Sequence, residues 1–154
     1  MINEKTLGII EIKKHQQNRY PLLFIDKVYE IIPGKSVKSR KCFSYNEWFF
    51  PAHFEDEPNV PGFVLVESMV QTFIMTFLTI EKFKGQKTNF SKIENVKFKQ
   101  KVVPGDVLDL YSELTSFKRG IAKGWCKALL GSVEVCSGEF VVVLPSELIQ
   151  MPAS

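Results

Sequence analysis

The stretch WFFPAHFEDEPNVPGFVLVESMVQ, residues 48–71, decides how this chain folds and where its reactive side chains lie. It carries His53 ahead of a proline-rich turn and Glu67 inside a nearly all-apolar run. An ionisable carboxyl among apolar residues is costly unless it has a partner or a function. Glu67 is therefore the first residue to explain.

The apolar run around Glu67 predicts a long helix at the centre of the fold. The helix is expected to begin at Gly62, and apolar residues occupy almost every face up to about Phe83. Polar residues interrupt the run, and no second apolar span accompanies it. We therefore expect a buried helix and no membrane insertion.

Segments with strand-like sequence patterns precede and follow this helix along the chain. Residues 22–32 and 35–43 are rich in branched and aromatic residues and are joined by a Pro-Gly turn. The four later segments are separated by turn residues at the spacing of an antiparallel meander; they cover residues 91–103, 107–117, 121–130 and 133–144. This order predicts an α+β fold, with an antiparallel sheet wrapped around the helix.

Two finer expectations concern local structure. Residues 47–50 are expected to form a short helical turn. Along residues 91–103, Val96 and Phe98 are expected on the packed face of a strand, while a lysine stripe faces solvent; its members are Lys97, Lys99 and Lys101. We interpret this lysine stripe as a solvent-exposed strand face rather than as a docking surface.

Length and composition indicate one globular domain. The 154 residues are 45% hydrophobic and carry a net charge of +3, which is ordinary for a folded domain. The domain is expected to span residues 1–154, with its core at about 19–144 and an N-terminal amphipathic helix at about 4–17. No basic helix or zinc spacing suggests nucleic-acid binding.

The cysteines and the N-terminus bear on localisation. Cys42, Cys126 and Cys136 leave one thiol unpaired in any disulfide scheme, which favours a reducing compartment. The first 17 residues lack the apolar segment and cleavage site of a secretory signal. We expect a cytoplasmic protein.

His53 and Glu67 together suit a reaction that removes one proton and supplies another. A histidine accepts a proton near neutral pH, and a carboxyl among apolar groups can stay protonated and act as an acid. The helix start at Gly62 offers unpaired N–H groups to a carbonyl oxygen that gains charge, and Gln71 can orient the carboxyl from one turn away. Structural roles for His53 and Glu67 remain the alternatives. Two such side chains are too few for a metal site.

These residues are specific enough to identify a resemblance. From about residue 11 to residue 144, the chain resembles the (3R)-hydroxyacyl-acyl-carrier-protein dehydratases of the hotdog fold. The resemblance rests on several short motifs in order: Arg19-Tyr20-Pro21-Leu22, Pro33-Gly34-Lys35, Asn46-Glu47, His53-Phe54, Pro61-Gly62, Glu67, Gln71 and Val102-Val103-Pro104-Gly105-Asp106.

The resemblance implies a homodimer whose active sites are shared between subunits, with a trimer of dimers left open. His53 of one subunit would remove the α-proton of a 3-hydroxyacyl thioester, and Glu67 of the other would protonate the leaving hydroxyl. Gly62 would bind the thioester carbonyl. Phe54, Phe63 and Gln71 complete the expected substrate-binding set, although Phe63 also suits the core. No metal or organic cofactor is implied, and an acyl carrier protein is the expected partner.

Some positions depart from the family pattern. Ala52, Glu55 and Asp56 stand where members commonly have other residues, and they suggest a specialised acyl or polyketide-like pathway as well as fatty-acid synthesis. Relatives that also isomerise the double bond usually have Asp where this chain has Glu67, which favours dehydration alone. The alternatives are a hotdog acyl thioesterase and a non-catalytic protein that binds acyl carriers.

Overall fold

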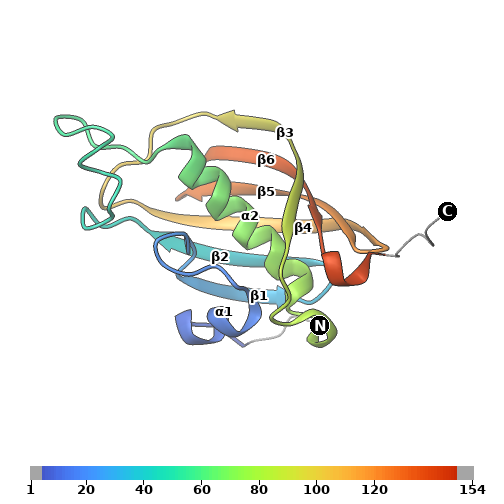
Figure 1. The fold of residues 1–154 in the computed structure, drawn as a ribbon. Helices are drawn as coiled ribbons and strands as arrows, with labels where there is room; N and C mark the ends of the chain where they lie inside the picture. The colour runs from blue at the N-terminus through green and yellow to red at the C-terminus, as the bar shows by residue number, and fades with distance from the viewer. Residues whose placement is uncertain (1–4, 149–154) are drawn as a thin grey trace.

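The computed structural model describes residues 5–148 and has one long helix against a single sheet (Figure 1). The helices are α1 (Ile9–His15) and α2 (Gly62–Leu78), with short 3-10 turns at Glu81–Phe83 and Pro145–Glu147. The strands are β1 (Lys27–Ile32), β2 (Ser36–Cys42), β3 (Asn89–Phe98), β4 (Val107–Lys118), β5 (Ile121–Leu130) and β6 (Val133–Val143).

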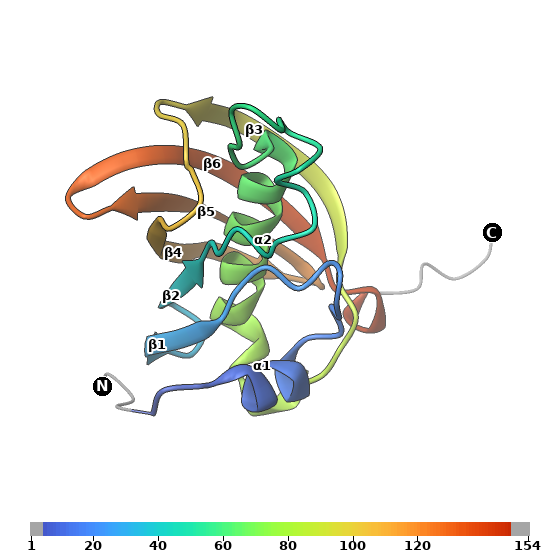
Figure 2. The ribbon, with the colours of Figure 1, turned by 90° about the vertical axis from the view of Figure 1, so that its left-hand side faces the viewer.

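The six strands form one antiparallel sheet in the order β1-β2-β4-β5-β6-β3. The sheet curves around α2, which lies across its concave face (Figure 2). The predicted α+β architecture is confirmed. The predicted meander holds for β4, β5 and β6, whereas β3 passes to the far edge and pairs only with β6 among the described strands.

Helix α2 is buried along most of its length, including its hydroxyl residues. The hydroxyls of Ser68 and Thr72 donate to the carbonyl oxygens one turn earlier, at 2.8 Å each. Thr72 also shares a 2.6 Å hydrogen bond with Ser39 of β2. Because these hydroxyls have partners, they can be buried without the cost of an orphaned polar group.

The sheet approaches α2 closely at a glycine of β5. A side chain at Gly124 would place its Cβ 2.5 Å from the ring of Phe73 on α2 and 2.2 Å from the carbonyl oxygen of Glu113. No side chain fits in that space. Gly124 therefore lets the Phe73 ring, which is fully buried, pack directly against the backbone of the sheet.

Several local expectations differ from the structure. Helix α1 is shorter than predicted, and α2 ends at Leu78 rather than near Phe83; residue 4 lies outside the described residues. Residues 47–50 form turns without a helix. Phe98 lies on the face that points toward α2, beside Gly62, but it is 54% exposed because it stands at the end of an edge strand.

Two further findings concern the helices and the cysteines. Among residues 5–148, no helix is both long and apolar enough to cross a membrane. The three cysteines are free thiols, with Cys126 and Cys136 buried and Cys42 exposed.

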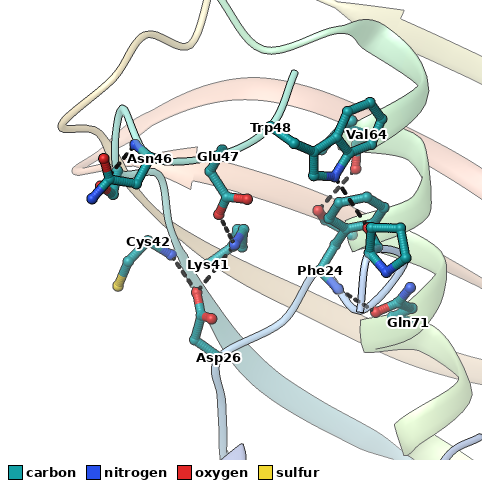
Figure 3. Close-up of polar contacts among 12 residues, drawn as sticks. Phe24, Asp26, Lys41, Cys42, Asn46, Glu47, Trp48, Val64 and Gln71 are labelled. Atoms are coloured by element: carbon teal, nitrogen blue, oxygen red, sulfur yellow. Dashed lines mark hydrogen bonds and ion pairs between the residues drawn. The ribbon is translucent and has the colours of Figure 1, made fainter. Parts of the chain in front are cut away.

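A buried lysine on β2 connects the sheet to the loop that leads to His53 (Figure 3). The ammonium of Lys41 lies 2.5 Å from a carboxylate oxygen of Glu47 and 3.6 Å from one of Asp26. Asp26 also accepts a hydrogen bond from the backbone N–H of Cys42. With only 5% of its side chain exposed, Lys41 depends on these carboxylates for its charge to be tolerated.

We expect Lys41→Met to lower the free energy of unfolding by about 3 kcal/mol, because it leaves the Glu47 carboxylate without its partner. Lys38→Met is the matched control on the same strand. Lys38 forms an exposed ion pair with Glu30, so its loss should cost less than about 1 kcal/mol. Equal urea-unfolding midpoints for the two variants would contradict the structural role of Lys41.

Candidate active site

His53 lies in the loop between β2 and α2 with its ring fixed by a backbone carbonyl. Its Nδ1 atom is 3.1 Å from the carbonyl oxygen of Asn59. A carbonyl oxygen can only accept, so Nδ1 carries the hydrogen of this bond. In the neutral ring, Nε2 is then the unprotonated nitrogen. The loop thus presents His53 as a base through Nε2.

The start of α2 borders the same cavity as His53. This cavity has a volume of about 430 Å³, and its lining includes His53, Gly62, Leu65 and Phe98. The first N–H groups of a helix have no partner within the helix and carry its positive end. At Gly62 an added Cβ would meet the Phe98 ring at 3.2 Å. Glycine keeps this approach to the helix end open.

Glu67 lies one turn further along α2 and lines a different cavity, of about 260 Å³. Its Oε1 atom accepts hydrogen bonds from Nε2 of Gln71 at 2.9 Å and from Nδ2 of Asn18 at 3.4 Å. Burial raises the pKa of the Glu67 carboxyl, while the Gln71 hydrogen bond acts in the opposite direction. Burial is the larger effect, and it favours the protonated acid.

The orientation of the Gln71 amide shows which oxygen of Glu67 can carry that proton. The backbone N–H of Phe24 donates to Oε1 of Gln71 at 2.7 Å (Figure 3), and Nε2 of Gln71 donates to the Leu22 carbonyl at 2.6 Å. The amide cannot be reversed without losing both bonds. Nε2 therefore donates to Oε1 of Glu67, and Oε2 remains as the oxygen for the proton.

Within one chain the side chains of His53 and Glu67, predicted to act together, line separate cavities. The cavity of His53 and the cavity of Glu67 have no lining residue in common. Of the other predicted site residues, Phe54 stacks on the His53 ring at a centroid distance of 4.4 Å and is 52% exposed. Phe63 is 58% exposed on the first turn of α2, so the expectation of a core position for Phe63 is wrong.

Comparison with known proteins places this arrangement in a family. Residues 17–139 match the FabA-like domain family. The chain belongs to the FabA-like family. Its predicted resemblance to hydroxyacyl-thioester dehydratases is thereby confirmed.

Curated FabA-like relatives match nearly the whole chain. A 3-hydroxyacyl-[acyl-carrier-protein] dehydratase FabZ of Clostridium botulinum (strain Loch Maree / Type A3) is 41% identical over 141 residues, which cover 92% of this chain and 98% of the relative. A FabZ of Clostridium beijerinckii is 43% identical over 140 residues, covering 90% and 99%.

Solved structures agree on the fold. The dehydratase heterocomplex ApeI:P from Xenorhabdus doucetiae matches with a TM-score of 0.75 at 15% identity, over 88% of this chain and 93% of that one. A putative thioesterase from Ralstonia eutropha matches with a TM-score of 0.57 at 14% identity, over 75% and 82%. At such low identity these likenesses establish the fold alone.

Two residues that hold the FabA-like site in place had no sequence signal of their own. Asn18 reaches Glu67 from a position 49 residues earlier, and Asn59 fixes His53 through a backbone carbonyl, which any residue possesses. Ala52 is not among the positive-φ residues of the described chain, so alanine introduces no backbone strain there. No cluster of three or more metal-ligating side chains occurs within residues 5–148.

Glu67→Gln should change how stability depends on pH. The pKa of Glu67 in the folded protein is raised above its ordinary value of 4.5, so the folded state holds the proton more tightly. The wild type should therefore lose stability as the pH rises from about 4 through the raised pKa, whereas the Gln variant should not. Denaturant unfolding across this range, at one protein concentration, measures the difference.

Glu57→Gln is a control in which the pH dependence of stability should change in the opposite direction. A hydrogen bond from Lys101 lowers the pKa of the Glu57 carboxyl, so its stabilising effect is present at high pH and is lost on acidification. A pH-independent difference between wild type and Glu67→Gln would show that Glu67 titrates alike in the folded and unfolded states.

Proposed function

We propose that this protein dehydrates 3-hydroxyacyl thioesters carried on acyl carrier protein, giving trans-2-enoyl thioesters and water in fatty-acid synthesis. The observation that carries the proposal is the buried carboxyl of Glu67, whose raised pKa favours the acid and whose Oε2 is left for the proton. Its FabZ relatives are 3-hydroxyacyl-[acyl-carrier-protein] dehydratases, which belong to the same reaction class.

The working site requires two copies of the chain. Strand β3 lies at the edge of the sheet and exposes Phe90, Ile93 and Phe98. An edge strand with exposed apolar residues suits pairing with another strand, and a two-fold axis makes that pairing antiparallel between identical strands. A dimer formed through β3 covers these side chains.

Antiparallel pairing of β3 also joins the two separate cavities. Asn89 and Phe90, at the start of β3, line the Glu67 cavity. Phe98, at the end of β3, lines the His53 cavity. When two copies pair in opposite directions, the start of one strand lies beside the end of the other. Glu67 of one subunit thus comes to lie beside the cavity that contains His53 of the partner subunit.

The proposed reaction uses Nε2 of His53 and Oε2 of Glu67 in this composite site. Nε2 of His53 takes the proton from carbon 2, and the electron pair of that C–H bond forms the double bond to carbon 3. The C3–O bond breaks, and the departing oxygen receives the proton from Oε2 of Glu67 and leaves as water. The N–H groups at Gly62 stabilise the charge that develops on the thioester carbonyl oxygen. Phe54 and Phe63 border the substrate as apolar contacts.

An acidic carrier protein fits the surface beside the His53 cavity. Lys99 and Lys101 line that cavity. Lys99 forms an ion pair with Glu134, and Lys101 with Glu57. Both pairs are exposed, so they hold their lysines weakly. A carboxylate from a carrier can replace either partner and deliver the phosphopantetheine arm to the cavity.

His53→Ala and Glu67→Gln should each lower kcat/KM by about 10²- to 10⁴-fold, because each removes one positioned proton-transfer group. Formation of the conjugated enoyl thioester, followed by its ultraviolet absorbance, measures the rate. Glu81→Gln, which changes an exposed carboxylate on the 3-10 turn after α2, should leave the rate unchanged. Wild-type rates in the two site variants would refute the assigned roles.

Mixing the two inactive variants tests whether the site is shared. A heterodimer of His53→Ala and Glu67→Gln subunits contains one site with both wild-type residues and one with neither. Random association after co-expression should therefore restore about a quarter of the wild-type activity. Absence of recovery in isolated heterodimers would mean that His53 and Glu67 act within one chain.

A further inference from the structure

The side-chain amide of Asn18 reaches the Glu67 carboxyl from outside α2. Its Nδ2 atom lies 3.4 Å from Oε1 of Glu67, the oxygen that also accepts from Gln71. Asn18 lines the Glu67 cavity, and its side chain makes no other hydrogen bond among the described residues. Gln71, by contrast, also holds two backbone groups. Asn18 is therefore the partner of Glu67 whose removal disturbs the fold less.

The backbone that carries Asn18 is held by the next residue, Arg19. The guanidinium of Arg19 donates to three backbone carbonyl oxygens at 2.8 Å each, those of Lys13, Gln16 and Asn18. A guanidinium presents its N–H donors in a rigid planar fork, so these bonds fix the path of the chain around it. Asn18 thus meets Glu67 from a rigid segment.

Among the described residues, no cation lines the Glu67 cavity. The lining comes from α2, from the segment before β1, from residues at the start of β3 and from β6, and Glu67 is the one ionisable side chain that residues 5–148 contribute to it. In the proposed dimer, His53 of the partner subunit also faces Glu67. The amides of Asn18 and Gln71 are the donors that this chain directs at the carboxyl.

Proton donation in the proposed reaction leaves a negative charge on Glu67. Oε2 gives its proton to the leaving hydroxyl, and the charge of the resulting carboxylate spreads over both oxygens. An N–H donor forms a shorter and stronger hydrogen bond with a carboxylate than with a neutral carboxyl. At 3.4 Å the bond from Asn18 is long, so it contributes little to the acid and can contract when the charge develops. Such a donor stabilises the transition state more than the resting state.

We propose that Asn18 is a positioning residue for the proton transfer: its Nδ2 donor holds Oε1 of Glu67 and stabilises the carboxylate that remains when Oε2 has given up its proton. The proposal rests on the dehydratase function. Asn18 acts through Glu67, in the same direction as Gln71 and against the burial that favours the acid. Without the Asn18 donor, Glu67 is a weaker acid.

Asn18→Leu removes the donor, keeps a similar volume and should raise the pKa of Glu67. Because the folded state then binds the proton more tightly, the loss of stability with rising pH should extend to higher pH, by about half a unit to one unit. The measured quantity is the difference in unfolding free energy between each protein and its Glu67→Gln counterpart. Urea denaturation from about pH 4 to about pH 9, at one protein concentration, isolates the contribution of Glu67.

The same substitution should also change the kinetics of dehydration. For the N-acetylcysteamine thioester of 3-hydroxydecanoate, we expect kcat to fall about three- to tenfold and KM to stay nearly constant, because the donor acts on charge that develops in the transition state. In the pH profile of kcat/KM, the limb that reports Glu67 should move to higher pH, and the limb that reports His53 should stay in place. Loss of packing alone would move neither limb.

Gln17→Leu is the matched control, because it replaces an amide with hydrocarbon one residue earlier. Nε2 of Gln17 donates to the carbonyl of Gly85 at 2.7 Å and not to Glu67, so this variant should retain the wild-type pH dependence and kcat. Asn18→Asp is a second test that preserves the size and polarity of the side chain. An aspartate cannot donate and adds a like charge beside Glu67, so the pH dependence should move further in the same direction.

The stability measurement needs no turnover, so it separates this inference from the function on which it rests. An unchanged pH dependence in both Asn18→Leu and Asn18→Asp would overturn the role of Asn18, even where the rate falls. A shifted pH dependence with an unchanged kcat would show that the donor takes no part in the proton transfer, and would also overturn it. A shift in the variants together with no enoyl thioester from the wild type would instead refute dehydration, while the coupling of Asn18 to Glu67 stands.

Discussion

The side-chain amide of Gln71 connects the fold to its chemistry. It accepts a hydrogen bond from Phe24, donates to Leu22 and donates to Glu67, so one group ties the N-terminal segment to α2 and orients the carboxyl. A fully buried amide needs such partners to be tolerated. Because the two backbone bonds fix its direction, the orientation of Glu67 follows from packing that lies outside the cavity.

The remaining structure holds the two proposed proton-transfer groups, His53 and Glu67, on rigid supports. Gly124 lets α2 approach the sheet closely, and this fixes the helix that carries Glu67. The Lys41–Glu47 ion pair fastens the loop before His53 to β2. The indole N–H of Trp48 donates to the carbonyl of Pro21 (Figure 3), which ties this loop to the segment that positions Gln71. The two halves of the site are thus braced against each other.

Much of the fold was predictable because its signals are local. The apolar run after Gly62 and the turn residues between strands depend on neighbouring positions, and both led to the correct architecture. The place of β3 was not predictable in this way, since its pairing with β6 depends on partners 38 to 54 residues away. Alternation placed Phe98 on the face toward α2, but its exposure depends on β3 being an edge strand, which neighbouring residues do not reveal.

The same distinction applies to the site. His53, Glu67 and Gln71 could be selected from the sequence because a histidine before a proline-rich turn and polar side chains within an apolar helix are uncommon. Asn18 could not, because a polar residue before a proline turn is ordinary until the fold brings it to Glu67.

Two polar side chains, those of Glu67 and Gln16, are buried at an energetic cost. The Glu67 carboxyl is desolvated, and the Gln16 amide has no partner in the described chain. Hydroxyls buried elsewhere on α2 are satisfied by the carbonyl oxygens of the helix itself. Burial of the Glu67 carboxyl beside a cavity has an energetic cost that a bound group can reduce by forming a hydrogen bond with it. For Glu67, the leaving hydroxyl of the proposed substrate is such a group, because it can accept the proton that burial favours on the carboxyl.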